Sequence, residues 1–105
     1  MKLSRRLLDE IVRRVVKVAR PEKIIMFGSA AKGRLGPDSD VDLLVVKSKV
    51  AHRGRLAQKI YLKLFGIEIP VDVVVVTPRD IAASQGKPGT ILEAVVRQGK
   101  VIYAA

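Results

Sequence analysis

The 105-residue sequence contains no cysteine and no tryptophan, and only two tyrosines and two phenylalanines. Without cysteine, the chain has no disulfides, no thiolate metal sites and no cysteine nucleophile, so any metal ion must be held by oxygen ligands. No apolar run approaches the roughly 18–20 residues that a membrane span requires. The longest candidate, residues 71–76, is interrupted by Asp72. Residues 1–20 lack the apolar core and cleavage site of a secretory signal, so we expect a cytoplasmic protein without membrane contact.

Basic residues outnumber acidic ones by 20 to 10, which gives a net charge of +10. The excess is concentrated in residues 1–37, which carry 10 basic and 3 acidic side chains. This charge suits a nucleic acid, a nucleoside triphosphate or an acidic protein partner, and charge alone does not choose among them. The few aromatic residues are not clustered among basic ones, as they are in single-strand binders. The sequence therefore argues against direct nucleic-acid binding.

The pattern of apolar residues predicts one α/β domain over residues 1–105. Helical spacing of apolar residues predicts helices over 3–19 and 51–65. Start signals at Thr77 to Asp80 and at Thr90 to Glu93 predict two more, the second covering 91–98. Apolar runs at 23–27, 41–46, 69–76 and 101–103 predict strands, and 28–39 reads as a loop with one helical turn. We expect an α/β (α+β) fold with about four strands in a mixed sheet, flanked by three or four helices.

Three isolated carboxylates interrupt the predicted strands. Asp40 and Asp42 are two positions apart, so the pleat directs both side chains to one face, and Asp72 lies in the next long strand. Carboxylates this close repel one another unless cations lie among them. Oxygen ligands in such an arrangement suit Mg²⁺ or Mn²⁺. The alternative is that all three are surface acids at strand ends and edges, and their spacing alone leaves both readings open.

The loop before this acidic pair favours a binding site. Gly28 and Ser29 follow a predicted strand and precede a short turn, where backbone N–H groups and a hydroxyl are suited to phosphate oxygens. Glycine at position 28 also lets the backbone approach a ligand closely. A phosphate cradle ten residues upstream of a metal-binding pair predicts one site built from two halves.

These residues resemble a known family. The stretch FGSAAKGRLGPDSDVDLLVV, residues 27–46, carries Gly28-Ser29, Gly33 in the loop, Ser39, and then Asp40-Val41-Asp42. This is similar to the signature of the nucleotidyltransferase superfamily related to DNA polymerase beta. Asp72 within VDVVVV and the closing ILEAVVRQGKVIY resemble the stand-alone minimal nucleotidyltransferases of prokaryotes, including antitoxins encoded beside toxins of the HEPN class (higher eukaryotes and prokaryotes nucleotide-binding).

The resemblance implies an activity and a set of roles. Asp40, Asp42 and Asp72 would be catalytic and would hold two divalent ions, Mg²⁺ or Mn²⁺. The nucleotide would be bound by Gly28, Ser29, Lys32, Arg34 and Ser39. The reaction implied is transfer of AMP from ATP to a hydroxyl, most simply a tyrosine of a small helical HEPN-class toxin. The acceptor would be recognised through that partner or through a homo-oligomer.

Two other functions stay open on the sequence. One is a catalytically silent antitoxin that neutralises its partner by complex formation, and the other is a nucleic-acid-binding regulator driven by the charge. Among the remaining residues, His52 reads as a surface residue without a role. Tyr61 and Phe65, at helical spacing, read as core residues. The basic face of the first helix reads as solvated, with docking as an alternative.

Overall fold

The helices and strands follow the predicted order. The computed structural model describes residues 3–33 and 40–105. Arg34 and Ser39, two of the predicted nucleotide ligands, lie outside the described residues. In chain order, the elements are α1 (Arg5–Ala19), β1 (Lys23–Phe27), the 3₁₀ turn η1 (Ala30–Lys32), β2 (Val41–Val46), α2 (Arg53–Lys63), β3 (Val71–Val76), α3 (Pro78–Ser84), α4 (Ile91–Gln98) and β4 (Lys100–Ala104).

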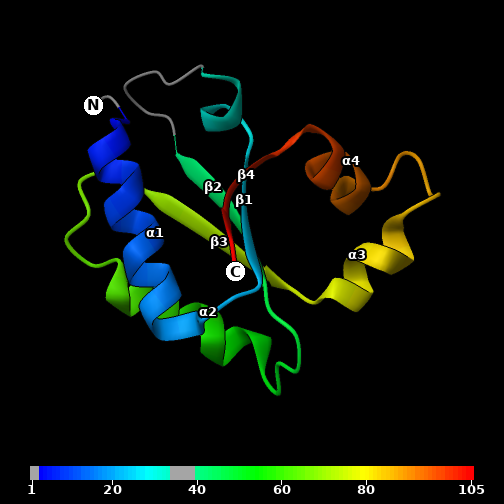
Figure 1. Cartoon of the computed structure of the whole chain (residues 1–105), viewed down its shortest axis with the longest axis horizontal. Helices are drawn as coiled ribbons and strands as arrows, with labels where there is room; N and C mark the ends of the chain where they lie inside the picture. Colours follow the sequence, from blue (N-terminus) through cyan, green and yellow to red (C-terminus); the bar gives the residue numbers. More distant parts are fainter. Residues whose placement is uncertain (1–2, 34–39) are drawn as a thin grey trace.

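The strands of the described residues form one four-stranded mixed sheet in the order β3-β2-β1-β4 (Figure 1). β1 pairs antiparallel with both β2 and β4, whereas β2 and β3 are parallel. Parallel neighbours need a crossover connection, and α2 supplies it. β2, which is apolar on both faces, lies inside the sheet, and β3 lies at its edge. The predicted α/β (α+β) fold with a mixed sheet is confirmed.

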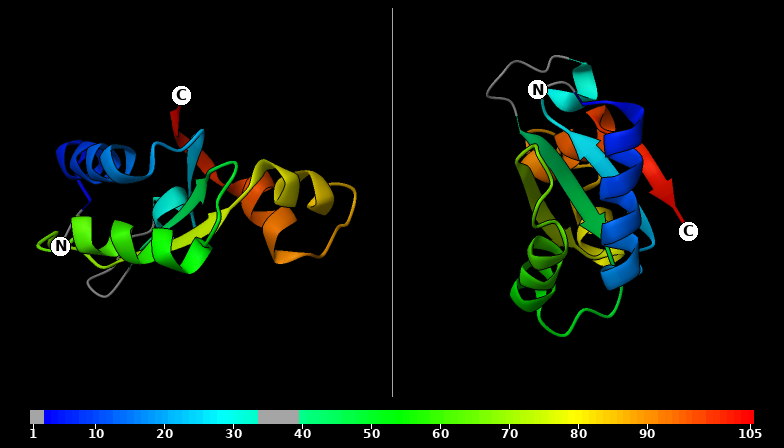
Figure 2. Two further views of the ribbon diagram at one scale, coloured as in Figure 1. Left: turned by 90° about the horizontal axis from the view of Figure 1, so that it is seen from below. Right: turned by 90° about the vertical axis from the view of Figure 1, so that its left-hand side faces the viewer.

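Two pairs of helices cover the two faces of the sheet (Figure 2). α1 and α2 pack on the face that carries Leu43, Val45 and Val73. α3 and α4 pack on the opposite face, which carries Leu44, Val46 and Val76. Because successive strand residues point to opposite faces, alternate apolar residues of β2 pack against the two pairs of helices. None of the helices in the described part of the chain combines the length and apolar character needed to cross a membrane.

The element ends differ from prediction by a few residues. The third strand begins at Val71 instead of residue 69, since Pro70 has no N–H for the ladder, although its carbonyl oxygen accepts from the N–H of Val41 at 2.9 Å. α2 begins at Arg53, where the Nδ1 atom of His52 accepts from the N–H of Arg55 at 3.3 Å. His52 is therefore a helix cap.

The expectation that Tyr61 and Phe65 belong to the core is wrong. Tyr61 is 43% exposed and Phe65 is 87% exposed. The buried positions of α2 and its C-terminal turn are Ile60 and Leu64, and the packed face of the helix does not extend to Tyr61. Phe65 lies beyond the last helical residue, so the helical period no longer directs its side chain inward.

Candidate active site

Asp42 and Asp72 lie side by side on the face of the sheet that carries α3 and α4. Val41, Leu43 and Val45 of β2 are buried on the opposite face, so the pleat turns Asp42 away from α1 and α2. The parallel register pairs Asp42 directly with Asp72 of β3. Neighbouring strands lie about 4.8 Å apart, which brings the two carboxylates into one electrostatic unit.

The environment of Asp42 disfavours its charge. Asp42 is half-buried, Asp72 is exposed at the sheet edge, and Asp40 is half-buried just before β2. Burial, reinforced by the negative charges of Asp72 and Asp40, raises the pKa of Asp42. A cation bound among these carboxylates would stabilise the ionised form of Asp42 and offset the unfavourable effect of burial and of the neighbouring negative charges.

Gly28 lies directly against the carboxylate of Asp42. β1 ends at Phe27, whose Cα pairs with that of Asp42, and the chain turns at Gly28 with φ +73°. A Cβ atom built on Gly28 would fall under 3.0 Å from the carboxylate of Asp42, a separation that real Cβ atoms essentially never show. Both the left-handed backbone and the close approach therefore require glycine at this position.

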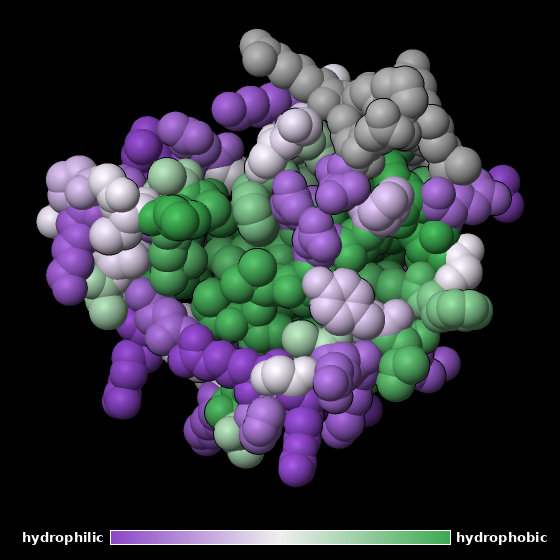
Figure 3. Space-filling view, turned by 180° about the vertical axis from the view of Figure 1, so that it is seen from behind, coloured by the Kyte–Doolittle hydropathy of each residue, from purple (hydrophilic) through white to green (hydrophobic). Residues whose placement is uncertain are grey.

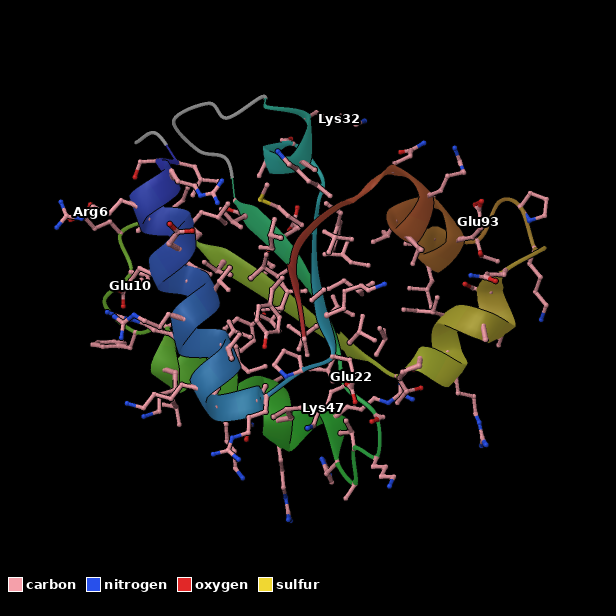
Figure 4. All side chains as sticks on the ribbon, in the orientation of Figure 1. Arg6, Glu10, Glu22, Lys32, Lys47 and Glu93 are labelled. Atoms are coloured by element: carbon pink, nitrogen blue, oxygen red, sulfur yellow. The ribbon has the colours of Figure 1, made fainter. Side chains whose placement is uncertain are left out.

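The turn after Gly28 is short and closes on itself. The N–H of Lys32 donates to the carbonyl oxygen of Ser29 at 3.1 Å, and the N–H of Gly33 donates to that of Ala30 at 3.2 Å. Ala30 is buried and anchors the turn, whereas Ser29 and Lys32 are exposed. Figure 4 shows Lys32 projecting from the end of the molecule opposite Glu22 and Lys47. The exposed hydroxyl of Ser29 and the ammonium of Lys32 thus lie on the same turn as Gly28.

The carboxylates fit a divalent cation that is shared with a substrate. Among the described residues, no three histidine, cysteine, aspartate or glutamate side chains converge closely enough to hold an ion by themselves. Mg²⁺ is usually bound by one or two carboxylates together with substrate phosphates, and seldom by an all-protein cage. The pair of Asp42 and Asp72, with Asp40 beside it, has the donor chemistry for this shared mode of binding.

A pocket that the sequence did not predict adjoins the turn. It has a volume of about 230 Å³ and lies between the turn and α4, where Gly28, Lys32, Val95 and Gln98 are among its lining residues. The α4 residues carry no local signal for this role, because helical spacing accounts for them as ordinary packing residues. Only the tertiary arrangement brings α4 next to the turn.

Comparison with known proteins identifies the family. Residues 5–97 match the sequence profile of the nucleotidyltransferase domain. The chain belongs to the nucleotidyltransferase domain family. No protein among the curated ones matches the chain.

Three solved structures are similar in fold to this chain. A protein from Sulfolobus solfataricus assigned as a nucleotidyltransferase is 20% identical, with a TM-score of 0.63 over 94% of this chain and 78% of that one. A toxin–antitoxin structure with AMP-PNP is 26% identical, with a TM-score of 0.55 over 92% of this chain and 73% of that one. A mutant toxin–antitoxin MntA–HpeT, with two aspartates two positions apart replaced by glutamate, is 24% identical, with a TM-score of 0.52 over 90% and 71% of the two chains.

The nucleotidyltransferase domain therefore presents its predicted residues in two groups. Gly28, Asp42 and Asp72 come together on one face of the sheet, with Asp40 at its margin. Ser29 and Lys32 lie on the exposed turn that follows Gly28.

Proposed function

We propose that this nucleotidyltransferase moves AMP from ATP onto a hydroxyl of a protein, a tyrosine of a HEPN-class toxin, and thereby acts as an antitoxin. The observation that carries the proposal is the placement of Gly28 against Asp42, with Asp72 paired to Asp42 in register. A backbone turn without a side chain beside a carboxylate pair leaves room for a triphosphate and its metal ions. We further propose that residues 1–105 form one minimal nucleotidyltransferase domain.

In this proposal the acidic residues serve metal binding and proton transfer. Asp40, Asp42 and Asp72 would hold two divalent ions, Mg²⁺ or Mn²⁺, which when bound supply positive charge to the triphosphate. Asp72, exposed at the sheet edge, is open to an incoming acceptor and would take the proton of its hydroxyl. The acceptor oxygen would then form its bond to the α-phosphorus as the bond to pyrophosphate breaks.

The turn would hold the rest of the nucleotide. The N–H of Gly28 and the hydroxyl of Ser29 would donate to the terminal phosphates, and Ser39 would add a further contact. Lys32 and Arg34 would balance the charge of the departing pyrophosphate.

Two of the similar structures support the nucleotide and the partner. One is a toxin–antitoxin crystallised with AMP-PNP, an ATP analogue, and it is 26% identical to this chain. The other is a toxin–antitoxin MntA–HpeT with a double substitution of aspartate by glutamate, and the two positions have the spacing of Asp40 and Asp42. An adenine nucleotide, a toxin partner and an aspartate pair are thus associated with this fold in proteins similar to the chain.

Intact-mass spectrometry tests the proposal. The purified protein is incubated with Mg²⁺, each of the four ribonucleoside triphosphates and the protein encoded by the adjacent gene. We expect the partner to gain one or more AMP masses with ATP, and to gain none with Asp42→Asn or after removal of Mg²⁺ by a chelator. Unchanged masses with a tight complex would support the catalytically silent antitoxin instead. RNA or DNA binding with steep salt dependence, and no complex, would support a nucleic-acid-binding regulator.

A further inference from the structure

The outward face of α2 combines exposed apolar groups with positive charge. Arg55, Lys59 and Leu62 are spaced i, i+4 and i+7 and so share one face of the helix. Leu62 is 77% exposed and Phe65 is 87% exposed, although both are large apolar side chains. Neighbouring exposed apolar groups rimmed by polar ones are typical of interaction sites. We call Arg55, Lys59, Leu62, Lys63 and Phe65 the α2 outer surface.

The backbone beneath this surface is held in place. The guanidinium of Arg14 on α1 donates to the carbonyl oxygens of Lys63 and Phe65 at 3.2 and 3.1 Å. Arg14 is itself oriented by Glu10, which accepts from its Nε at 2.8 Å. The C-terminal end of α2 is therefore tied to α1, and Phe65 is presented to solvent from an ordered backbone. Such preorganisation lowers the entropy that a partner must overcome on binding.

The basic side chains of this surface favour an acidic partner. Residues 51–67 contain no aspartate or glutamate. Arg55, Lys59 and Lys63 follow one another at intervals of four residues, and like charges at this spacing repel. Arg53 is paired with Asp80 at 2.7 Å, whereas none of the other three is within ion-pair distance of a carboxylate in the described part of the chain. Carboxylates supplied by a partner would remove this repulsion.

α2 lies against the edge strand that carries Asp72, although the two carboxylates of the candidate active site lie on the other face of the sheet. The hydroxyl of Tyr61 on α2 accepts from the N–H of Val73 at 2.8 Å, and Val73 directly follows Asp72 on the edge strand. Seen from behind, where α2 and β3 lie, hydrophobic side chains gather in the middle of the molecule and hydrophilic ones surround them (Figure 3). A protein bound to the α2 outer surface therefore lies beside the edge strand β3, and it reaches Asp72 by extending around that edge to the other face of the sheet.

We propose that the α2 outer surface is the docking site for the acceptor protein, which presents an acidic face with an apolar centre. The proposal rests on the proposed function in that the acceptor is a protein. A nucleic acid does not fit as well, because Leu62 at the centre of the surface offers nothing to a phosphate. A second copy of this chain does not fit either, because a symmetric contact would place the same three cations against each other.

Calorimetric titration tests the docking site, with the protein encoded by the adjacent gene as the probe. We expect Leu62→Ser with Phe65→Ser to raise Kd by at least about 30-fold, as expected for loss of central apolar anchors. Lys59→Gln with Lys63→Gln should weaken binding and reduce its salt dependence. The control is Val101→Ser, which removes an exposed apolar side chain, 52% exposed, from β4 and should leave Kd unchanged.

Several results would overturn the docking site. These are wild-type affinity in the Leu62/Phe65 variant, no binding by the wild-type protein, or a wild-type dimer in light scattering that the Leu62/Phe65 substitutions dissociate. Tight binding of a 20-nucleotide RNA that the same substitutions abolish would assign the surface to nucleic acid instead.

The two proposals fail in different ways. Binding that depends on Leu62 and Phe65, without mass gain on the partner, would keep the docking site and reject AMP transfer. Mass gain that is equally fast with the Leu62/Phe65 variant would keep AMP transfer and reject the docking site. Asp42→Asn is expected to bind the partner with wild-type affinity and to transfer nothing.

Discussion

Gly28 packs against Asp42 so closely that no side chain fits between them, and its φ of +73° lies in the left-handed region. Gly28→Ala would push against the carboxylate of Asp42 and displace either the turn or the acid. We expect a loss of nucleotidyl transfer of at least about 100-fold, since small misplacements at a reacting centre have effects of this size. The measurement is the initial rate of mass gain on the acceptor.

The control for this substitution is Gly33→Ala. Gly33 also has a positive φ, of +69°, but a Cβ atom there would meet no atom within 4 Å among the described residues. Gly33→Ala therefore introduces the backbone strain, about 1–2 kcal/mol, without the collision. Equal losses of transfer rate in the two variants would show that strain, and not the contact with Asp42, is responsible.

The charge of Asp42 is expected to reduce stability when no metal ion is bound. Burial and the neighbouring carboxylates raise its pKa, which means that the ionised form is disfavoured in the folded protein. Asp42→Asn removes the charge, so we expect it to stabilise the metal-free protein and to raise its Tm. Asp9→Asn, on the exposed face of α1, is the control and should leave Tm nearly unchanged. A lower Tm for Asp42→Asn at neutral pH without Mg²⁺ would contradict the expectation.

Glu22 makes stability depend on acid pH. Its carboxylate accepts hydrogen bonds from the hydroxyl and the N–H of Ser48, the latter at 2.9 Å, and the hydroxyl contact is the main cause that lowers the pKa of Glu22 below 4.5. Because the pKa of Glu22 is lower in the folded protein than in the unfolded chain, its ionised carboxylate stabilises the fold above pH 4.5. This stabilisation is lost as the pH falls through the pKa of the folded state. Glu22→Gln should therefore lower the urea midpoint at pH 7, and the gap to wild type should narrow at pH 3. The exposed Glu68→Gln is the control, and a gap of equal size at both pH values would contradict the assignment.

Arg14 and Arg13 provide a matched pair on α1. Both guanidinium groups bind Glu10, but only Arg14 also donates to the carbonyl oxygens of Lys63 and Phe65. Arg14→Gln should lower the free energy of unfolding by about 1 kcal/mol through the lost hydrogen bonds to α2. Arg13→Gln should lower it by less than about 0.5 kcal/mol, as expected for an exposed ion pair. Equal values in chemical unfolding would show that the contact with α2 contributes nothing.

The helix and strand assignments were predictable because their signals are local. The alternation of residues along a strand predicted that Asp40 and Asp42 lie on one face. Thr77 and Asp80 predicted the start of α3, where both hydrogen bonds of the capping box are present. The exposure of Tyr61 and Phe65 was not predictable in this way. Helical spacing assigns a residue to a face of the helix, but it does not show where the neighbouring elements stop covering that face.

The sequence by itself determined the order of the elements, their approximate ends, the mixed α/β class and the placement of Asp40 and Asp42 on one face. Periodicity and helix caps depend only on nearby residues, which is why these features could be predicted. Only the tertiary structure decided that Asp72 stands in register with Asp42, that Gly28 touches its carboxylate and that Arg14 fixes the chain at Phe65. These relationships join residues up to 51 positions apart. They depend on strand register and helix packing, which no local pattern encodes.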